Sequence, residues 1–164
     1  MATIKFKGEP ANTAGDLPQQ GETLKDIKLV DSELNEKSLS NYKGKKLVLN
    51  IFPSIATGVC QKAMRSFHEK LSEKDDVVIL NISKDLPFAA KQFCAAEGIE
   101  NAVMLSDFRG DFGSTYGTTL VDSPFQGLLS RAVVVTDAEG KVVYTEQVSD
   151  IVNEPDYDAA IAAL

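Results

Sequence analysis

The sequence predicts an α/β fold in which helices flank a mixed central sheet. Apolar runs of strand length, at 46–52 and 77–82, alternate with segments whose apolar residues recur every three or four positions, as in an amphipathic helix. Near the end, two strand-like runs meet at Glu139-Gly140, which predicts an antiparallel hairpin and therefore a mixed sheet. The 164 residues suffice for a single domain, residues 1–164, with a substantial core.

The first part of the chain predicts short strands and turns, and then a buried strand. Residues 3–8 alternate apolar and polar side chains, as an edge strand does, so we expect an extra β-hairpin at the N-terminus. Residues 24–30 alternate less cleanly. The run Lys46–Phe52 predicts a buried strand, and a short loop leads from it into a helix. That helix carries one apolar stripe, made of Cys60, Met64, Phe67 and Leu71.

After this helix, strands and helices continue to alternate. Pro87 and Gly98 bracket a second helix, because proline is favoured in the first turn and glycine just past the last. The final helix is expected to open at Asn153-Glu154-Pro155. The remaining predicted strands are 77–82, 102–105, 132–135 and 141–148, and the last helix has a stripe of Tyr157, Ile161 and Leu164. This order, with helices on both faces of the sheet and a cysteine at the first strand-to-helix junction, is the thioredoxin-like arrangement.

Composition and charge exclude several functional classes. Hydrophobic residues make up 43% of the chain and charged residues 25%, which is typical of a soluble globular protein. The net charge of −7 repels phosphate groups, so we expect neither nucleic acid nor an anionic membrane as a partner. The first residues lack the apolar core of a secretory signal, and no apolar run is long enough to span a bilayer, so we expect a cytoplasmic protein. One histidine and two cysteines are too few ligands for a structural zinc site.

Cys60 is the leading functional candidate. It lies in the first turn of the helix that follows strand 46–52, where free backbone N–H groups and the helix dipole favour a thiolate over a thiol. Only the thiolate is a strong nucleophile. The alternative is that Cys60 is one more buried member of the apolar stripe. Its place after a sheet strand, where α/β folds bind their ligands, favours the reactive role without excluding the structural one.

Other side chains each have two interpretations. Thr57 is either the N-cap of the helix or a hydroxyl placed to contact the sulfur or an incoming oxygen. Pro53 either ends the strand or stiffens the loop and shields the thiolate from water. Arg131, just before an apolar strand, is either solvated or close enough to Cys60 to favour the thiolate and hold a peroxide oxygen. His68, the only histidine, lies more than two helical turns beyond Cys60, which argues against a Cys-His catalytic pair.

Cys94 is the second thiol and belongs to the helix between Pro87 and Gly98. Alone, it is best interpreted as a core position beside Phe93. Together with Cys60 it is a candidate resolving thiol, although the pair does not have C-x-x-C spacing, which disfavours a simple dithiol oxidoreductase. A disulfide requires Cα atoms about 4.4–6.8 Å apart. Two cysteines on separate helices meet that limit only if a helix unwinds locally, so we expect a conformational step.

Several motifs occur together along nearly the whole chain. The first is the spacing Pro53-x-x-x-Thr57-x-x-Cys60. The others are Asn50-Ile51-Phe52-Pro53-Ser54-Ile55, Asp85-Leu86-Pro87-Phe88-Ala89, Phe93-Cys94, Ala96-Glu97-Gly98, Ser130-Arg131-Ala132-Val133 and Glu154-Pro155-Asp156-Tyr157. The spacing resembles the active-site pattern of peroxiredoxins, and the whole set resembles the bacterial thiol peroxidases, an atypical two-cysteine branch of that family.

This resemblance implies a thioredoxin-dependent peroxidase without a metal or organic cofactor. Cys60 would be the peroxidatic cysteine, whose thiolate attacks the peroxide and becomes a sulfenic acid. Cys94 would resolve that acid as an intramolecular disulfide, which thioredoxin recycles. Thr57 and Arg131 would orient the peroxide and stabilise the developing charge, and Pro53 would shield the sulfur. The implied substrates are hydroperoxides, with alkyl hydroperoxides favoured over hydrogen peroxide, and the implied assembly is a homodimer.

Two further expectations concern the approach to Cys60. We expect Ile55 and Phe88 to line the path of an apolar peroxide. Ala56 stands where the family usually has Asp, a residue that would cap the helix or hold the loop through local hydrogen bonds. We expect activity to survive this difference, with an altered rate or loop stability.

Two alternative functions stay open on sequence grounds. A general thiol–disulfide oxidoreductase would act on protein disulfides without peroxide, and the lack of C-x-x-C argues against it. A redox sensor or chaperone-like binding protein would use the cysteine pair as a switch, react slowly with peroxide and bind its partner differently in its two redox states. A purely structural role leaves the clustered motifs unexplained.

Overall fold

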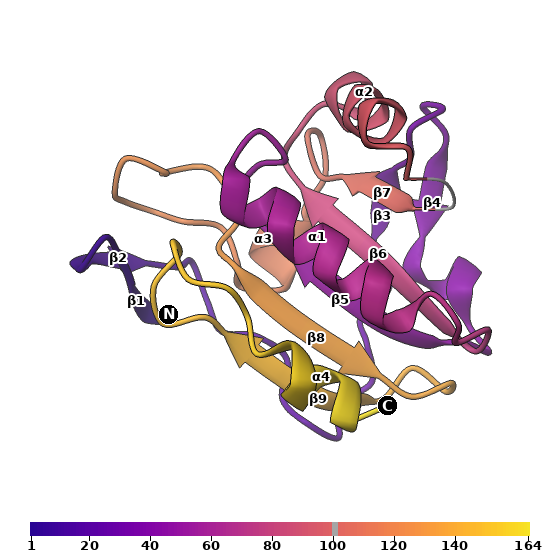
Figure 1. Ribbon diagram of the computed structural model, residues 1–164. Helices are drawn as coiled ribbons and strands as arrows, with labels where there is room; N and C mark the ends of the chain where they lie inside the picture. The colour runs from indigo at the N-terminus through magenta and orange to yellow at the C-terminus, as the bar shows by residue number, and fades with distance from the viewer. Residues whose placement is uncertain (100–101) are drawn as a thin grey trace.

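The computed structural model describes residues 1–99 and 102–164, which form a large mixed sheet with helices packed on both faces (Figure 1). A separate two-stranded sheet is formed by β1 (Thr3–Phe6) and β2 (Glu9–Asn12). The seven strands of the large sheet are β3 (Lys28–Val30), β4 (Glu36–Ser38), β5 (Lys46–Ile51), β6 (Val77–Ser83), β7 (Val103–Ser106), β8 (Ala132–Thr136) and β9 (Val142–Gln147). The helices are α1 (Gly58–Leu71), α2 (Pro87–Glu97), α3 (Phe112–Thr115) and α4 (Tyr157–Ala162), with the 3-10 helix η1 (Leu39–Tyr42).

The strand order in the large sheet is β4-β3-β7-β6-β5-β8-β9. Strand β5 runs parallel to β6 and antiparallel to β8, so the sheet is mixed, as predicted. In the register, Ile51 at the end of β5 pairs with Ile82 on one side and with Ala132 on the other. The loops that follow β5 and β6 and the residues that precede β8 therefore meet at one edge of the sheet.

The predicted N-terminal β-hairpin is confirmed, since Thr3 pairs with Asn12 across β1 and β2. The weakly alternating segment 24–30 forms only the short strand β3, which pairs with β4 and joins the large sheet beside β7. Sequence patterning did not assign β3 and β4 to this sheet, because each strand has only three residues and its place depends on pairing with distant segments.

Helix ends follow the local sequence in most cases. Pro87 occupies the first turn of α2, and Gly98 ends it in the left-handed conformation with φ of 65°. Helix α4 begins at Tyr157, later than the expected opening at Asn153-Glu154-Pro155. The reason is that Asp156 is the N-cap, and its carboxylate accepts a hydrogen bond from the backbone N–H of Ala159 at 3.0 Å.

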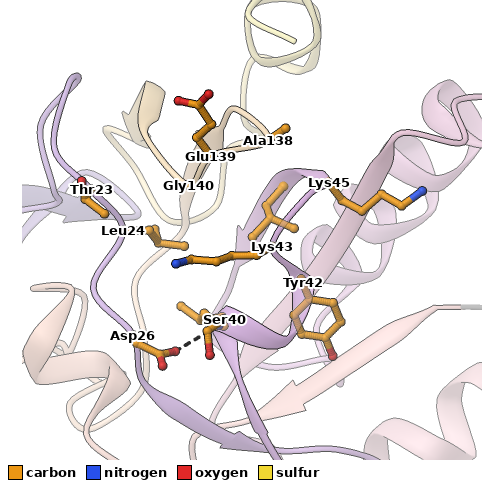
Figure 2. Close-up of a pocket in the computed structure, with 12 residues that line it drawn as sticks. Thr23, Leu24, Asp26, Ser40, Tyr42, Lys43, Lys45, Ala138, Glu139 and Gly140 are labelled. Atoms are coloured by element: carbon orange, nitrogen blue, oxygen red, sulfur yellow. Dashed lines mark hydrogen bonds between the residues drawn. The ribbon is translucent and has the colours of Figure 1, made fainter.

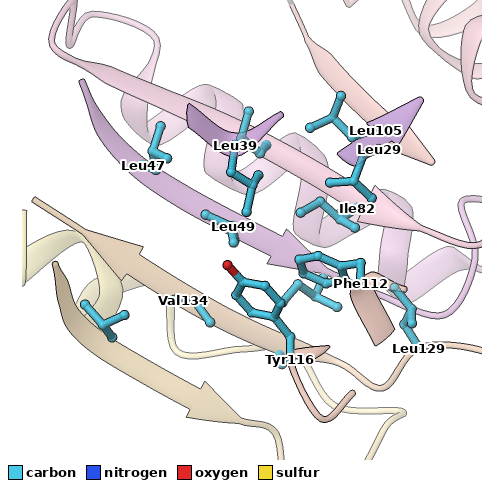
Figure 3. Packing of buried hydrophobic residues seen from close by; sticks show 14 residues of the cluster. Leu29, Leu39, Leu47, Leu49, Ile82, Leu105, Phe112, Tyr116, Leu129 and Val134 are labelled. Atoms are coloured by element: carbon cyan, nitrogen blue, oxygen red, sulfur yellow. The ribbon is translucent and has the colours of Figure 1, made fainter. Parts of the chain in front are cut away.

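Two apolar layers cover the sheet. On one face, the stripe of α1 and the inner side of α4 pack on the central strands, through Phe67 and Ala160 among others. On the other face, Phe112 and Tyr116 stack with ring centroids 4.4 Å apart and pack on the leucines of the sheet (Figure 3). Helix α3, which the sequence pattern did not predict, starts where the buried Asp107 carboxylate accepts the backbone N–H groups of Phe112 and Gly113.

The arrangement matches the thioredoxin-like fold expected from the order of elements, with a mixed central sheet, flanking helices and an extra N-terminal hairpin. Among the residues that the structure describes, no helix combines the length and the apolar character needed to cross a membrane.

Candidate active site

Cys60 lies in the first turn of α1, beyond the end of β5. Its side chain is 0% exposed and packs among Phe52, Ile55, Met64 and other apolar residues. The sulfur is therefore withdrawn from bulk water and placed near the unpaired backbone N–H groups at the start of a helix. This is a position from which a thiol reacts only with a small or well-fitted partner.

Arg131 is the charged group that reaches Cys60. Its Nη2 donates to the Cys60 Sγ at 3.4 Å, and its Nε donates to the carbonyl oxygen of Ile151 at 2.8 Å. The side chain is only 3% exposed, and no carboxylate in residues 1–99 or 102–164 forms an ion pair with it. A buried positive charge is costly unless an anion accompanies it, and the adjacent sulfur becomes that anion when it is deprotonated. Arg131 is thus close to Cys60 and not a solvated residue at a strand end.

One nitrogen of this guanidinium makes no hydrogen bond to the part of the chain that the structure describes. The buried Nη1 of Arg131 has no hydrogen-bond partner among the described residues. Buried N–H groups are normally paired, so this N–H is available to a hydrogen-bond acceptor that the described residues do not supply.

The loop from Pro53 to Thr57 carries the other predicted residues. Pro53 is buried, and Thr57 occupies the N-cap position of α1. The Thr57 side chain does not cap the helix, because its hydroxyl donates to the carbonyl oxygen of Ser54 at 3.1 Å. With its proton used there, the Thr57 hydroxyl keeps its lone pairs free to accept a hydrogen bond.

The same loop is held by a residue that sequence reasoning did not single out. Asp85, in the junction between β6 and α2, accepts hydrogen bonds from the Ser54 hydroxyl, the Ile55 backbone N–H and the Ser83 hydroxyl, each at 2.7 Å. Asp85 belongs to one of the motifs that carry the family resemblance, but its contacts depend on the parallel pairing of β5 with β6. Local patterning carries no sign of them.

Cys94 lies on α2 and is half-buried. It packs against the same apolar cluster that contains Cys60, through the partly buried side of the helix. Burial raises the pKa of the Cys94 thiol. Both cysteines are free thiols in this structure.

Comparison with known proteins places this arrangement in a family. The redoxin family model matches residues 19–161. The chain belongs to the redoxin family. Over its full length it is 51% identical to the thiol peroxidase of Corynebacterium glutamicum and 46% identical to that of Mycobacterium tuberculosis, with 99% of each relative covered. Within the redoxins it is accordingly a peroxiredoxin-type peroxidase, similar to the bacterial thiol peroxidases.

Solved redoxin structures have the same fold. A peroxiredoxin-like protein from Aquifex aeolicus is 33% identical and superposes with a TM-score of 0.91, over 99% of this chain and 95% of the other. The thiol peroxidase from Chromobacterium violaceum is 22% identical with a TM-score of 0.92, over 99% of this chain and 95% of that one, which shows the shared fold.

The remaining predicted residues of this redoxin lie in different environments. Ile55 is buried beside Cys60, whereas Phe88, at the start of α2, is 61% exposed. The structure brings Ile55, but not the ring of Phe88, into the cluster around the thiol. Ala56 is exposed, and its backbone N–H donates to the Ser54 hydroxyl at 3.1 Å.

His68 lies in a groove between the end of α1 and the end of α2, away from the thiol, as expected. Its Nε2 is 3.1 Å from the side-chain amide of Asn81, and burial lowers the pKa of the imidazole. In residues 1–99 and 102–164, no three His, Cys, Asp or Glu side chains gather closely enough to hold a metal ion.

Figure 2 shows a separate pocket. Its lining includes Lys45 and Leu47, at the start of β5, whereas Cys60 follows the end of that strand. The pocket has a volume of about 140 Å³ and is lined by Leu24, Tyr42, Lys43 and Glu139, among others. None of the predicted site residues contributes to it. The predicted site residues are therefore separate from this pocket.

Proposed function

We propose that this redoxin reduces hydroperoxides at Cys60, alkyl hydroperoxides in preference to hydrogen peroxide. The observation that carries the proposal is the hydrogen bond from the buried guanidinium of Arg131 to the Cys60 sulfur. In that contact a positive charge lies beside the sulfur, and the thiolate is the nucleophile of peroxide reduction. The family relationship to thiol peroxidases supports the same reaction.

In the first step, the Cys60 thiolate attacks one peroxide oxygen and the O–O bond breaks. The sulfur is oxidised to a sulfenic acid, and the leaving oxygen departs as an alcohol, or as water from hydrogen peroxide, after taking a proton. The unpaired Nη1 of Arg131 suits the negative charge that develops on the leaving oxygen. The lone pairs of the Thr57 hydroxyl suit the peroxide O–H, which would orient the substrate.

Apolar surroundings account for the proposed preference for alkyl hydroperoxides. Ile55 packs in the apolar cluster that contains Cys60, and Pro53 is buried in the loop that leads to it, so both would help to exclude water from the thiol. Phe88, exposed at the start of α2, would contact the alkyl part of a larger substrate as it approaches. Hydrogen peroxide would gain nothing from such contacts and would react more slowly.

In the second step, Cys94 condenses with the sulfenic acid, so that a disulfide forms and water leaves. Since Cys94 is held in a helix, this step requires α2 to unwind locally. Thioredoxin, a protein dithiol, would then reduce the disulfide and return both thiols. We further propose a homodimer in the cytoplasm, a reducing compartment that suits two free thiols.

The test is peptide mass mapping after one equivalent of cumene hydroperoxide is added to the reduced protein. We expect a rapid Cys60–Cys94 disulfide within single chains. Cys60→Ser should abolish peroxide consumption. Cys94→Ser should consume one equivalent and then stall with thioredoxin.

Each outcome has a clear meaning. Two free thiols with the peroxide unconsumed would overturn the peroxidase proposal and favour a redox switch or a disulfide oxidoreductase. Normal turnover of Cys94→Ser with thioredoxin would overturn the resolving role of Cys94 alone.

A further inference from the structure

We propose that Asp85 is a positioning residue that holds the Thr57 hydroxyl and the Cys60 loop in the geometry needed for attack on peroxide. This inference rests on the proposed reaction at Cys60 and adds a residue from another strand to it. Asp85 touches neither the sulfur nor the expected peroxide site, and its effect passes through Ser54.

The contacts form a short chain of hydrogen bonds. One carboxylate oxygen of Asp85 accepts the Ser54 hydroxyl, and the other accepts the Ile55 backbone N–H, both at 2.7 Å. The carbonyl oxygen of Ser54 in turn accepts the Thr57 hydroxyl at 3.1 Å and the Thr57 backbone N–H at 3.2 Å. Asp85 thus holds Ser54 in place. Ser54 in turn sets the orientation of the Thr57 hydroxyl and of its free lone pairs.

A carboxylate suits this place because its bonding partners are all donors. The third one is the Ser83 hydroxyl, also at 2.7 Å. Two oxygens with several lone pairs accept all three, and charge-assisted hydrogen bonds are about twice as strong as neutral ones. An amide has a single acceptor oxygen, so a serine hydroxyl would have to turn and accept from its NH₂ group. An alanine would leave the Ile55 N–H without its acceptor.

The same residue is also tied to the strand on its other side and to the helix of Cys94. The backbone carbonyl of Asp85 accepts a hydrogen bond from the Ser106 hydroxyl of β7. Helix α2 begins two residues after Asp85, at Pro87. When α2 unwinds to bring Cys94 forward, Asp85 is placed to keep the Cys60 loop fixed while the helix beyond it moves.

The test compares two reactions of Cys60 in Asp85→Ala. The first is oxidation by cumene hydroperoxide, which needs Thr57 in place. The second is alkylation by iodoacetamide at the same pH, which needs the thiolate but no oriented hydroxyl. We expect the peroxide rate constant to fall at least about tenfold, since small misplacements of a reacting group are costly, while alkylation stays unchanged or becomes faster.

A double-mutant cycle identifies the route of the effect. Thr57→Val should reduce the peroxide rate much less in the Asp85→Ala background than in the wild type, because the hydroxyl is already misplaced there. The matched control is Asp137→Ala, which removes a carboxylate that accepts the backbone N–H groups of Glu139 and Lys141 at the far end of β8. This control should change neither rate. If Asp85→Ala does not fold, Asp85→Asn takes its place with a smaller expected loss.

Results that overturn the inference are distinct from those that overturn the proposed function. A peroxide rate within twofold of the wild type, an equal fall of both rates, or full additivity with Thr57→Val would refute the positioning role. In each of these cases Cys60→Ser would still abolish peroxide consumption. If Cys60→Ser kept consuming peroxide, the proposed function itself would be wrong.

Discussion

The two cysteines of this protein lie against one apolar cluster but in unequal surroundings. Cys60 is fully buried on α1, whereas Cys94 is half-buried on α2. Helix α1 buries five side chains, and α2 buries two, Pro87 and Ala90. Since burial of apolar surface is the main stabilising term, α1 is anchored much more firmly than α2.

The polar contacts differ in the same direction. The Cys60 region is held by a buried hydrogen bond from Arg131 to the Cys60 sulfur and by a partly buried one from the Ile55 backbone N–H to Asp85. The side-chain ion pairs of α2, Lys91 with Glu33 and Arg65 with Glu97, lie at the surface, where such pairs contribute little. The comparison teaches that Cys60 is held more firmly than Cys94, so the proposed disulfide would form by movement of α2.

The largest expected effect tests the contact between Arg131 and Cys60, on the more firmly held helix α1. Arg131→Met keeps the size of the side chain and removes its charge and its donors. We expect the rate of Cys60 oxidation by cumene hydroperoxide to fall about 10²–10³-fold, the usual loss when a donor to a developing negative charge is removed. Single-turnover quenched-flow measurements would show it.

Stability separates this effect from unfolding. A buried charge replaced by an apolar side chain of similar volume often costs little stability, so the urea midpoint of Arg131→Met should change little. A rate within threefold of the wild type would show that the guanidinium is not part of the fixed site.

A smaller expected effect, about tenfold per pH unit in the rate of disulfide formation, concerns Cys94 on the less firmly held helix α2. Burial raises the pKa of the Cys94 thiol, so at neutral pH most of it is protonated and cannot attack. We expect disulfide formation to accelerate as the pH rises and to keep accelerating past about 8.5, the ordinary cysteine value. Acid-quenched mass spectrometry after one equivalent of peroxide measures this step. A plateau below pH 8 would contradict the raised pKa.

The smallest expected effect, about fivefold in the rate of disulfide formation, tests whether α2 must unwind. Gln92 is an exposed residue of α2. Glycine destabilises a helix by about 1 kcal/mol relative to alanine, so Gln92→Gly should form the disulfide about fivefold faster than Gln92→Ala. Acid-quenched mass spectrometry after one equivalent of peroxide measures both rates.

The matched control lies on α1, where Glu69 is also exposed. Glu69→Gly and Glu69→Ala should form the disulfide at the same rate. Equal rates for the two Gln92 variants would show that disulfide formation does not depend on unwinding of α2.

Much of the fold was predictable because its signals are local. The strands β5 and β6 are apolar runs, the stripe of α1 has helical spacing, and Pro87 and Gly98 mark the ends of α2. The start of α4 was misplaced by a few residues, since the cap that begins it is Asp156. Strands β3 and β4 and helix α3 were not predicted, because distant pairing and the carboxylate of Asp107 define them.

The candidate site divides in the same way. Pro53, Thr57 and Cys60 are close in sequence, so local position made them candidates, and the resemblance of their spacing to the peroxiredoxin pattern implied their roles. Arg131 was named by a motif, but its contact with the sulfur depends on the antiparallel pairing of β5 with β8. Asp85 was part of a motif, but no role was assigned to it, since its partners Ser54 and Ile55 belong to another loop.

By itself, the sequence determined the α/β class, the main helices and strands, and the thiol at the first strand-to-helix junction. These follow from the spacing of neighbouring residues, which sets local backbone structure. Only the tertiary structure decided which side chains reach that thiol. The register of β5 with β6 and β8 brings three distant segments to one edge of the sheet, and pairing between strands far apart in the chain is a property of the whole fold.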